Sequence, residues 1–327
     1  MNLERYSKIN ILMWVIYPVI FVGFMLFMFF TCGHKDKQTG KVADDSIRKM
    51  EFVMVSIPQD ITAPKERANY LVNHYWDNFN FSDTAYIHQP EITEQAFVNY
   101  IGILTHSSRT SAYFSIGEML TKAKKTSQRM YRYFLDIYKK YLYDANSPIR
   151  DDEFYIPVVE YILKDTVSDI TTKERAKFAL SMMQKNRKGE VATDLTYTLQ
   201  SGKQGRLYQI ESEYILLMFY NPDCHACSDA INYLKQSKLI NALLAEKRLN
   251  ILAFYPDSEL SIWKKHLEDI PATWINGYDK DIIVKNKLTY DLKAIPTLYL
   301  LDKDKTVLFK DADIMQLEAW LKSRNMN

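Results

Sequence analysis

Two cysteines at the junction of two different sequence patterns constrain the fold of this chain most. Cys224 and Cys227 are two of the three cysteines among 327 residues. The apolar run 216–220 precedes them without polar alternation, which is typical of a central strand covered on both faces. A helical pattern follows them from Ala230 onward. The pair therefore lies where a buried strand passes into a helix.

The patterns that follow residue 188 predict an α/β domain. Apolar runs at residues 251–255 and 297–301 indicate further buried strands, and a shorter strand is expected at 307–309. Helical patterns lie at 262–267 and again at Ile314, Leu317 and Leu321. The order is strand, cysteine pair, helix, strand, helix, strand, strand, helix, which is the order of a thioredoxin fold.

Two stretches, YILLMFYNPDCHAC and KAIPTLYLLDKDKTVLF, resemble the thioredoxin family. The most similar branch is the membrane-tethered TlpA/ResA-like thiol-disulfide oxidoreductases. The resemblance implies an α/β thioredoxin fold for residues 188–327 and a redox-active Cys224–Cys227 couple that needs no cofactor. It also implies that Pro296 is a cis-proline facing the couple, which leaves the backbone of Ile295 to pair with an extended protein substrate.

The position of Cys224 favours this residue as the attacking sulfur. The thiolate is the nucleophile, and a free cysteine with a pKa near 8.5 is only about 3% ionised at pH 7. Unpaired N–H groups and the dipole at a helix start favour an anion. A protonated His225 would add to this effect, and Asp223 would oppose it. Cys227, one turn inside the helix, is expected to be more shielded and to resolve the mixed disulfide.

Two positions depart from the pattern of the family. Many thioredoxins carry a buried acid six residues before the first cysteine, where this chain has Met218. Asp223 replaces the tryptophan that usually precedes that cysteine. Proton transfer to and from Cys227 must therefore use water or another group.

Two other interpretations of the pair stay open. A metal knuckle would use Cys224, His225 and Cys227, but adjacent ligands on one turn have poor geometry and no second Cys-x-x-Cys supplies a fourth ligand, so we expect no metal. Alternatively, the chain is a non-catalytic interaction protein in which the thioredoxin-like domain is a scaffold. The cysteines would then be at most a staple, and a loop this short constrains the unfolded chain little.

Residues 51–187 carry apolar residues at helical spacing and predict an all-α domain. Pro64 and Pro157 are each expected beside a helix start, and Thr171 with Glu174 predicts a capping box at another. The stretch ERANYLVNHYWDNFNFSD resembles a helical domain that precedes thioredoxin-like domains in some bacterial envelope proteins. That resemblance implies no chemistry.

Residues 11–30, ILMWVIYPVIFVGFMLFMFF, form an uncharged apolar run long enough to cross a bilayer as a helix. Arg5 and Lys8 precede it, which favours a cytoplasmic start. Cys32 follows at once, and FFTCGHK resembles a bacterial lipoprotein signal in which this cysteine is lipidated. We therefore expect residues 1–32 to be an uncleaved membrane anchor or a lipoprotein signal, and residues 33–50 to be a linker.

These features together predict a thiol-disulfide oxidoreductase of the bacterial cell envelope, of the protein-disulfide reductase type. We expect it to be anchored in the membrane and to face the periplasm or the exterior. The expected partners are protein thiols and disulfides, a membrane electron donor or acceptor, and the lipid bilayer through the N-terminus. A net charge of +2 with no basic run interleaved with aromatics argues against nucleic acid as a partner.

Overall fold

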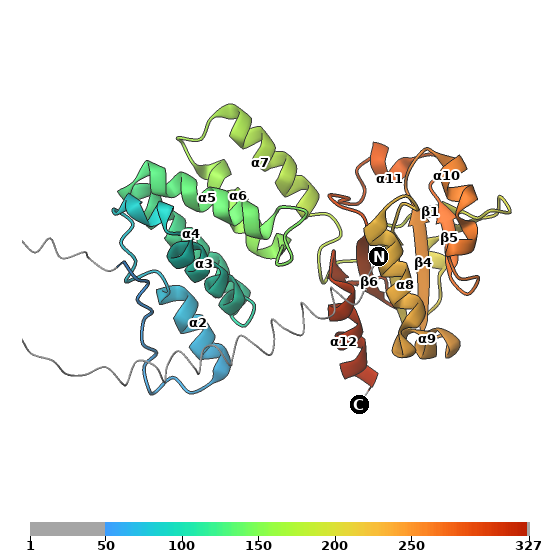
Figure 1. Cartoon of the computed structure of the whole chain (residues 1–327), viewed down its shortest axis with the longest axis horizontal. Coiled ribbons are helices and arrows are strands. Elements are labelled where there is room, and N and C mark those ends of the chain that lie inside the picture. The colour runs from blue at the N-terminus through green and yellow to red at the C-terminus, as the bar shows by residue number, and fades with distance from the viewer. Residues whose placement is uncertain (1–49, 326–327) are drawn as a thin grey trace, which may run out of the picture. The chain divides into compact units, whose positions relative to one another are not determined.

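A computed structural model describes residues 50–325 of the chain (Figure 1). The expected membrane segment at 11–30, Cys32 and nearly all of the expected linker lie outside the described residues. Within residues 50–325, no helix is both long enough and apolar enough to span a membrane. The described chain contains an all-helical region followed by an α/β region, as predicted, and the two belong to one structural unit.

The helical region is built around a core rich in aromatic side chains. Its elements are α2 (Pro64–His74), the 3₁₀-helix η1 (Thr84–His88), α3 (Pro90–Leu104), α4 (Arg109–Thr126), α5 (Gln128–Leu142), α6 (Asp152–Lys164) and α7 (Ile170–Met183). Trp76 is 3% exposed, and the rings of Tyr75, Tyr100 and Phe134 lie 5.2–5.6 Å from its ring centroid. Such edge-on and tilted ring contacts stabilise a core beyond the burial of apolar area alone.

The helix starts differ in part from those expected. Pro64 begins α2 as predicted, at a position where its missing N–H group is not needed. Pro157 lies inside α6, which begins at residue 152, because Asp151 caps the helix by accepting hydrogen bonds from the first-turn N–H groups. The capping box at Thr171 was also wrong: Asp169 caps α7, two residues earlier. An aspartate before the first turn is among the strongest N-caps.

One buried carboxylate joins three parts of the helical region. Asp165 follows α6 and is 3% exposed. It accepts hydrogen bonds from Lys124 at 2.5 Å, Ser168 at 2.8 Å, the Val167 N–H group at 3.0 Å and Tyr131 at 3.2 Å. Burial acts to raise the pKa of Asp165, but Lys124 and the other donors outweigh burial and hold the pKa well below its ordinary value.

The α/β region contains a seven-stranded sheet with the strand order β2-β1-β5-β4-β3-β6-β7. The strands are β1 (Thr196–Thr198), β2 (Gln204–Arg206), β3 (Tyr214–Phe219), β4 (Leu249–Tyr255), β5 (Ile275–Tyr278), β6 (Thr297–Asp302) and β7 (Val307–Lys310). β3, β4 and β5 are parallel, whereas β6 runs antiparallel to β3 and β7. The predicted strands correspond to β3, β4, β6 and β7. The short strands β1, β2 and β5 were not predicted.

Both faces of the sheet are covered, which explains why its central strands lack polar alternation. One face packs against α8 (His225–Gln236), α9 (Lys238–Ala245), α10 (Leu260–Lys265) and α12 (Ile314–Asn325). The other face packs against the short α11 (Ile283–Asn286), Tyr290 and the segments on either side of β1 and β2, through Ala192, Leu195, Leu207 and Ile210. Successive residues of β3 alternate between these two cores, so all from 215 to 219 are buried.

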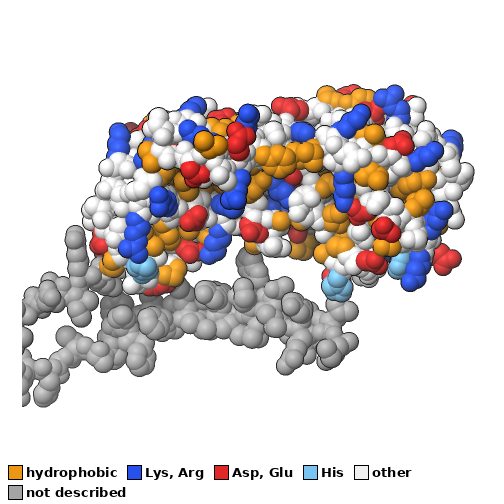
Figure 2. All heavy atoms as spheres, turned by 90° about the horizontal axis from the view of Figure 1, so that it is seen from above, with side chains coloured by type: hydrophobic (Ala, Val, Ile, Leu, Met, Phe, Trp, Pro, Cys, Tyr) orange, Lys and Arg blue, Asp and Glu red, His pale blue; other side chains and the backbone are white. Residues whose placement is uncertain are grey.

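Charges of both signs are mixed on the molecular surface. Figure 2 shows Lys and Arg side chains interspersed with Asp and Glu over the face in view. That face therefore presents no extended field of one sign, in keeping with the net charge of +2.

We expect Asp165→Asn to lower the free energy of unfolding by about 1–3 kcal/mol, because Lys124 and the neighbouring donors lose a charged partner. This difference in the free energy of unfolding should become smaller in acid. The folded-state pKa of Asp165 lies below the unfolded value of about 3.9, so its contribution is present above that pH and disappears as the pH falls through the folded-state pKa. Urea unfolding of the variant at neutral and acid pH measures both effects.

Asp77→Asn is the matched control. Asp77 pairs with Lys122 at 2.6 Å, but both side chains are about two-fifths exposed. Asp77→Asn should therefore lower the free energy of unfolding by no more than about 0.5 kcal/mol. Equal losses in the two variants would contradict the stabilising role of the buried carboxylate.

Candidate functional site

The antiparallel pairing of β3 with β6 brings two loops to the same edge of the sheet. Phe219, the last residue of β3, is paired with Thr297, the first residue of β6. The chain reaches Cys224 five residues after Phe219, and Thr297 directly follows Ile295 and Pro296, which are joined by a cis peptide bond. The Cys224 thiol donates a hydrogen bond to the carbonyl oxygen of Ile295 at 3.3 Å. The register of the sheet thus brings the cysteine pair and the Ile-Pro dipeptide together.

A tight turn carries the chain from β3 into α8. Asn221 and Pro222 occupy the first two positions of this turn, where these residue types are favoured, and the Cys224 N–H group donates to the Asn221 carbonyl at 3.0 Å. The Asn221 side chain accepts from the Asp223 N–H group at 3.0 Å and donates to Asp257 at 2.8 Å. Sequence analysis missed Asn221 and Asp257 as supports of the site, although the Asn-Pro pair signals a turn.

The two sulfurs lie in different environments. Cys224 is the N-cap of α8, where its Sγ accepts a hydrogen bond from the Cys227 N–H group at 3.3 Å. The sulfur is therefore at the amino end of a 12-residue helix, where N–H groups and the helix dipole stabilise an anion. Cys224 is partly exposed, whereas Cys227 is 0% exposed. Burial raises the pKa of the Cys227 thiol, and its hydrogen bond with Cys224 raises it further.

The surroundings of Cys227 are apolar. Met218 is fully buried in the same hydrophobic core as Cys227, so β3 supplies no carboxylate there. A polar hollow of about 130 Å³ borders the turn before Cys224, and it is lined by Tyr220, Asn221, Pro222, Ser228, Ile231, Asn232, Lys235, His266 and Asp269. A space of this size holds several water molecules. Any water that enters the hollow would lie beside the first turns of α8.

His225 and Asp223 extend into solvent. The His225 side chain is 93% exposed, and its Nε2 lies 3.5 Å from a carboxylate oxygen of Asp229, one helical turn away. Asp223 is also exposed. Any influence of the Asp223 charge, or of His225 when it is protonated, on Cys224 is therefore screened by water and salt. Among the described residues, no group of three or more His, Cys, Asp or Glu side chains is placed to hold a metal ion.

Two family models match the sequence. A domain of unknown function, DUF5106, matches residues 31–186, and the model described as thioredoxin-like matches residues 212–307. The first match includes the helical region and the second contains Cys224 and Cys227. No curated protein matches the sequence.

Several solved structures are similar to the chain. A thioredoxin-like protein from Bacteroides caccae is 50% identical, covers 83% of this chain and 98% of its own, and has a TM-score of 0.78. The C-terminal domain of an uncharacterized protein from Bacteroides fragilis is 55% identical over 42% of this chain and 98% of its own, with a TM-score of 0.41. The thioredoxin domain of a thiol-disulfide oxidoreductase from Bacteroides vulgatus is 24% identical over 42% of this chain and 96% of its own, with a TM-score of 0.38.

The difference between the two sulfurs is open to a direct test. In the folded, reduced protein we expect iodoacetamide to modify Cys224 at least about tenfold faster than Cys227, because the reagent needs an accessible thiolate. Peptide mass spectrometry after brief labelling at pH 7.5 gives the two rates. In protein unfolded in guanidinium, the ratio of the Cys224 rate to the Cys227 rate should be close to one. Equal rates in the folded protein would contradict the burial of Cys227.

Proposed function

Since the chain belongs to the thioredoxin-like family, we propose that it is a thiol-disulfide oxidoreductase that exchanges disulfides with proteins through the Cys224-His225-Ala226-Cys227 couple. One observation carries this proposal. An accessible sulfur at the start of α8 lies 3.3 Å from the Ile295 carbonyl oxygen, with a buried second thiol one turn behind it.

In the reducing direction, the Cys224 thiolate attacks one sulfur of a substrate disulfide. The substrate S–S bond breaks, a mixed disulfide forms, and the leaving thiolate takes up a proton. Cys227 then loses its proton and attacks the Cys224 sulfur, which forms the intramolecular disulfide and releases the second substrate thiol. Two electrons pass to the substrate, and an external thiol or a membrane donor must reduce the couple again. In the oxidising direction, the same steps run in reverse.

Ile295 is the proposed backbone contact for the substrate. Its carbonyl accepts a hydrogen bond from the Cys224 thiol in the protonated state. The second lone pair of this carbonyl, and the first once Cys224 ionises, can accept an N–H group from an extended substrate segment, as in strand addition.

The proposed resolving step is limited by the environment of Cys227. Its thiol must ionise in a site whose burial raises its pKa, and Met218 offers no base. Water from the polar hollow is the proposed proton acceptor. Attack by Cys227 is intramolecular, and this proximity offsets the low fraction of thiolate.

We further propose that the protein acts at the cell envelope, facing the periplasm or the exterior. The apolar run 11–30, with Arg5 and Lys8 before it, supports this location, and Cys32 supports lipidation. A reporter fused after Asn327 should be active outside the cytoplasm, and activity restricted to the cytoplasm would contradict the proposal. Fatty-acid labelling lost in Cys32→Ser would identify a lipoprotein, whereas unchanged membrane attachment without labelling would identify a plain anchor.

Trapping of mixed disulfides tests the proposed chemistry. We expect Cys227→Ser to accumulate covalent complexes with protein substrates, because the resolving thiol is absent, and Cys224→Ser to accumulate almost none. Both variants should reduce insulin at least about 100-fold more slowly than the unmodified protein. Gln236→Ala is the control, since this exposed residue at the end of α8 lies outside the couple and does not line the hollow. An unmodified protein without insulin-reducing activity would favour the scaffold interpretation.

A further inference from the structure

The loop that carries Ile295 has no regular secondary structure between α11 and β6, at residues 287–296. Several of its polar groups are bound from outside this segment. Lys185, which follows α7, donates to the Leu288 carbonyl, and the Asn186 side chain donates to the Thr289 carbonyl at 2.9 Å. The buried Tyr290 donates its hydroxyl to the backbone before β1. The conformation of the loop therefore depends on parts of the chain about 100 residues away in sequence.

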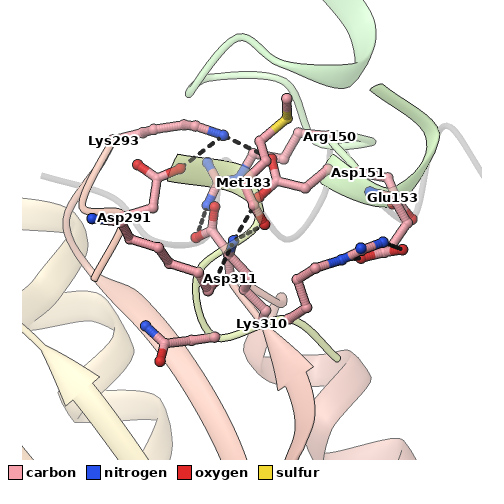
Figure 3. Close-up of polar contacts among 12 residues, drawn as sticks. Arg150, Asp151, Glu153, Met183, Asp291, Lys293, Lys310 and Asp311 are labelled. Atoms are coloured by element: carbon pink, nitrogen blue, oxygen red, sulfur yellow. Dashed lines mark hydrogen bonds and ion pairs between the residues drawn. The ribbon is translucent and has the colours of Figure 1, made fainter. Parts of the chain in front are cut away.

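Among these contacts of the loop, the one at Lys293 is nearest to Ile295 in sequence. Lys293 lies two residues before Ile295, and its ammonium group is 2.7 Å from one oxygen of Asp152 at the start of α6. The same group is 3.2 Å from Asp291 (Figure 3) and 4.1 Å from the centre of the Tyr143 ring. The Lys293 side chain is 14% exposed. A lysine held by two carboxylates and an aromatic face has little freedom to move.

Asp152 joins this loop to the rest of the structure. Its second oxygen is 2.9 Å from Lys310 at the end of β7, which also donates to the carbonyls of Met183 and Lys185 at 3.0 Å each. Burial acts to raise the pKa of Asp152, but the charges of Lys310 and Lys293 outweigh burial and lower it. The carboxylate is therefore ionised at neutral pH, and one charge holds both the loop and β7 against the helical region.

We infer that the helical region positions the Ile295 loop for docking of protein disulfides, with Asp152 and Lys293 as the positioning residues. The inference rests on the proposed function. A loop fixed before the substrate arrives loses less conformational freedom on binding, which strengthens binding of an extended segment. A small disulfide that needs only Cys224 gains nothing from this arrangement. The effect should therefore depend on the kind of substrate.

Lys310 provides the matched control within the same network. It binds the same carboxylate and is 9% exposed, but it lies on β7 and not on the Ile295 loop. Lys310→Met and Lys293→Met each remove one charged partner of Asp152. Both should cost stability, and only Lys293→Met should change docking.

The test uses the full chain and two oxidants, insulin and the small disulfide DTNB. Dithiothreitol is the reductant with insulin, whereas DTNB, which dithiothreitol reduces directly, is mixed with protein that has been reduced beforehand and freed of dithiothreitol. We expect Lys293→Met to raise the KM for insulin about five- to tenfold, with kcat and the DTNB rate within about twofold of the unmodified protein. Asp152→Asn, which conserves side-chain volume, should act in the same direction. The double variant should raise KM no more than the larger single effect, because both residues act through one contact.

The outcomes separate the two hypotheses. An unmodified protein that does not reduce insulin overturns the proposed function and this inference together. An active protein in which Lys293→Met and Asp152→Asn keep the KM for insulin overturns the inference alone. The inference is also overturned if Lys310→Met raises the KM for insulin as much as Lys293→Met does. It is overturned as well if Lys293→Met slows the reaction with DTNB as much as the reaction with insulin. In both cases the ion pairs would only stabilise the structure.

Discussion

The pairing of β3 with β6 is the constraint on which the candidate site depends. Side chains alternate between the two faces of the sheet, so a shift of one residue in this pairing would exchange the two cores on either side. The buried side chains of β3 fix the register, and the register in turn aligns Phe219 with Thr297. The loop after β3 and the loop before β6 then meet at one edge. The short distance between Cys224 and Ile295 is thus a consequence of core packing.

The same core determines how the two thiols differ. α8 packs on the sheet through residues such as Ile231 and Leu234, and this packing buries Cys227 while leaving Cys224 at the helix end. In the reduced protein, the raised pKa of Cys227 keeps this thiol neutral at physiological pH. Because the pKa of Cys227 is higher in the folded than in the unfolded protein, its contribution to stability is complete below the unfolded pKa and is lost as the pH rises towards the folded pKa. Alkaline conditions should therefore lower the free energy of unfolding of the reduced form more than that of the disulfide form.

Much of this architecture follows from local sequence patterns. Long apolar runs predict β3, β4 and β6 because burial on both faces leaves a continuous signal, whereas β1 and β2 have three residues each and are too short to give one. The cysteine pair and Pro296 were predicted as neighbours from the family resemblance. The contact between Asp152 and Lys293 was not predicted, because it joins residues 141 apart. Charged residues in loops and at helix starts are ordinarily exposed, so composition gives no hint of their burial.

The network around Asp152 is better explained by specificity than by stability. Arg150 pairs with Asp311, and Arg187 binds Glu153 at 2.9 Å, so several ion pairs lie where α6 meets the α/β region. Desolvation offsets much of the attraction in each pair, and apolar side chains would stabilise such a contact at least as well. Apolar contacts, however, permit sliding, whereas a charge pair of fixed geometry selects one arrangement. For a loop whose proposed task is to hold a substrate backbone beside a sulfur atom, one fixed arrangement is the property that matters.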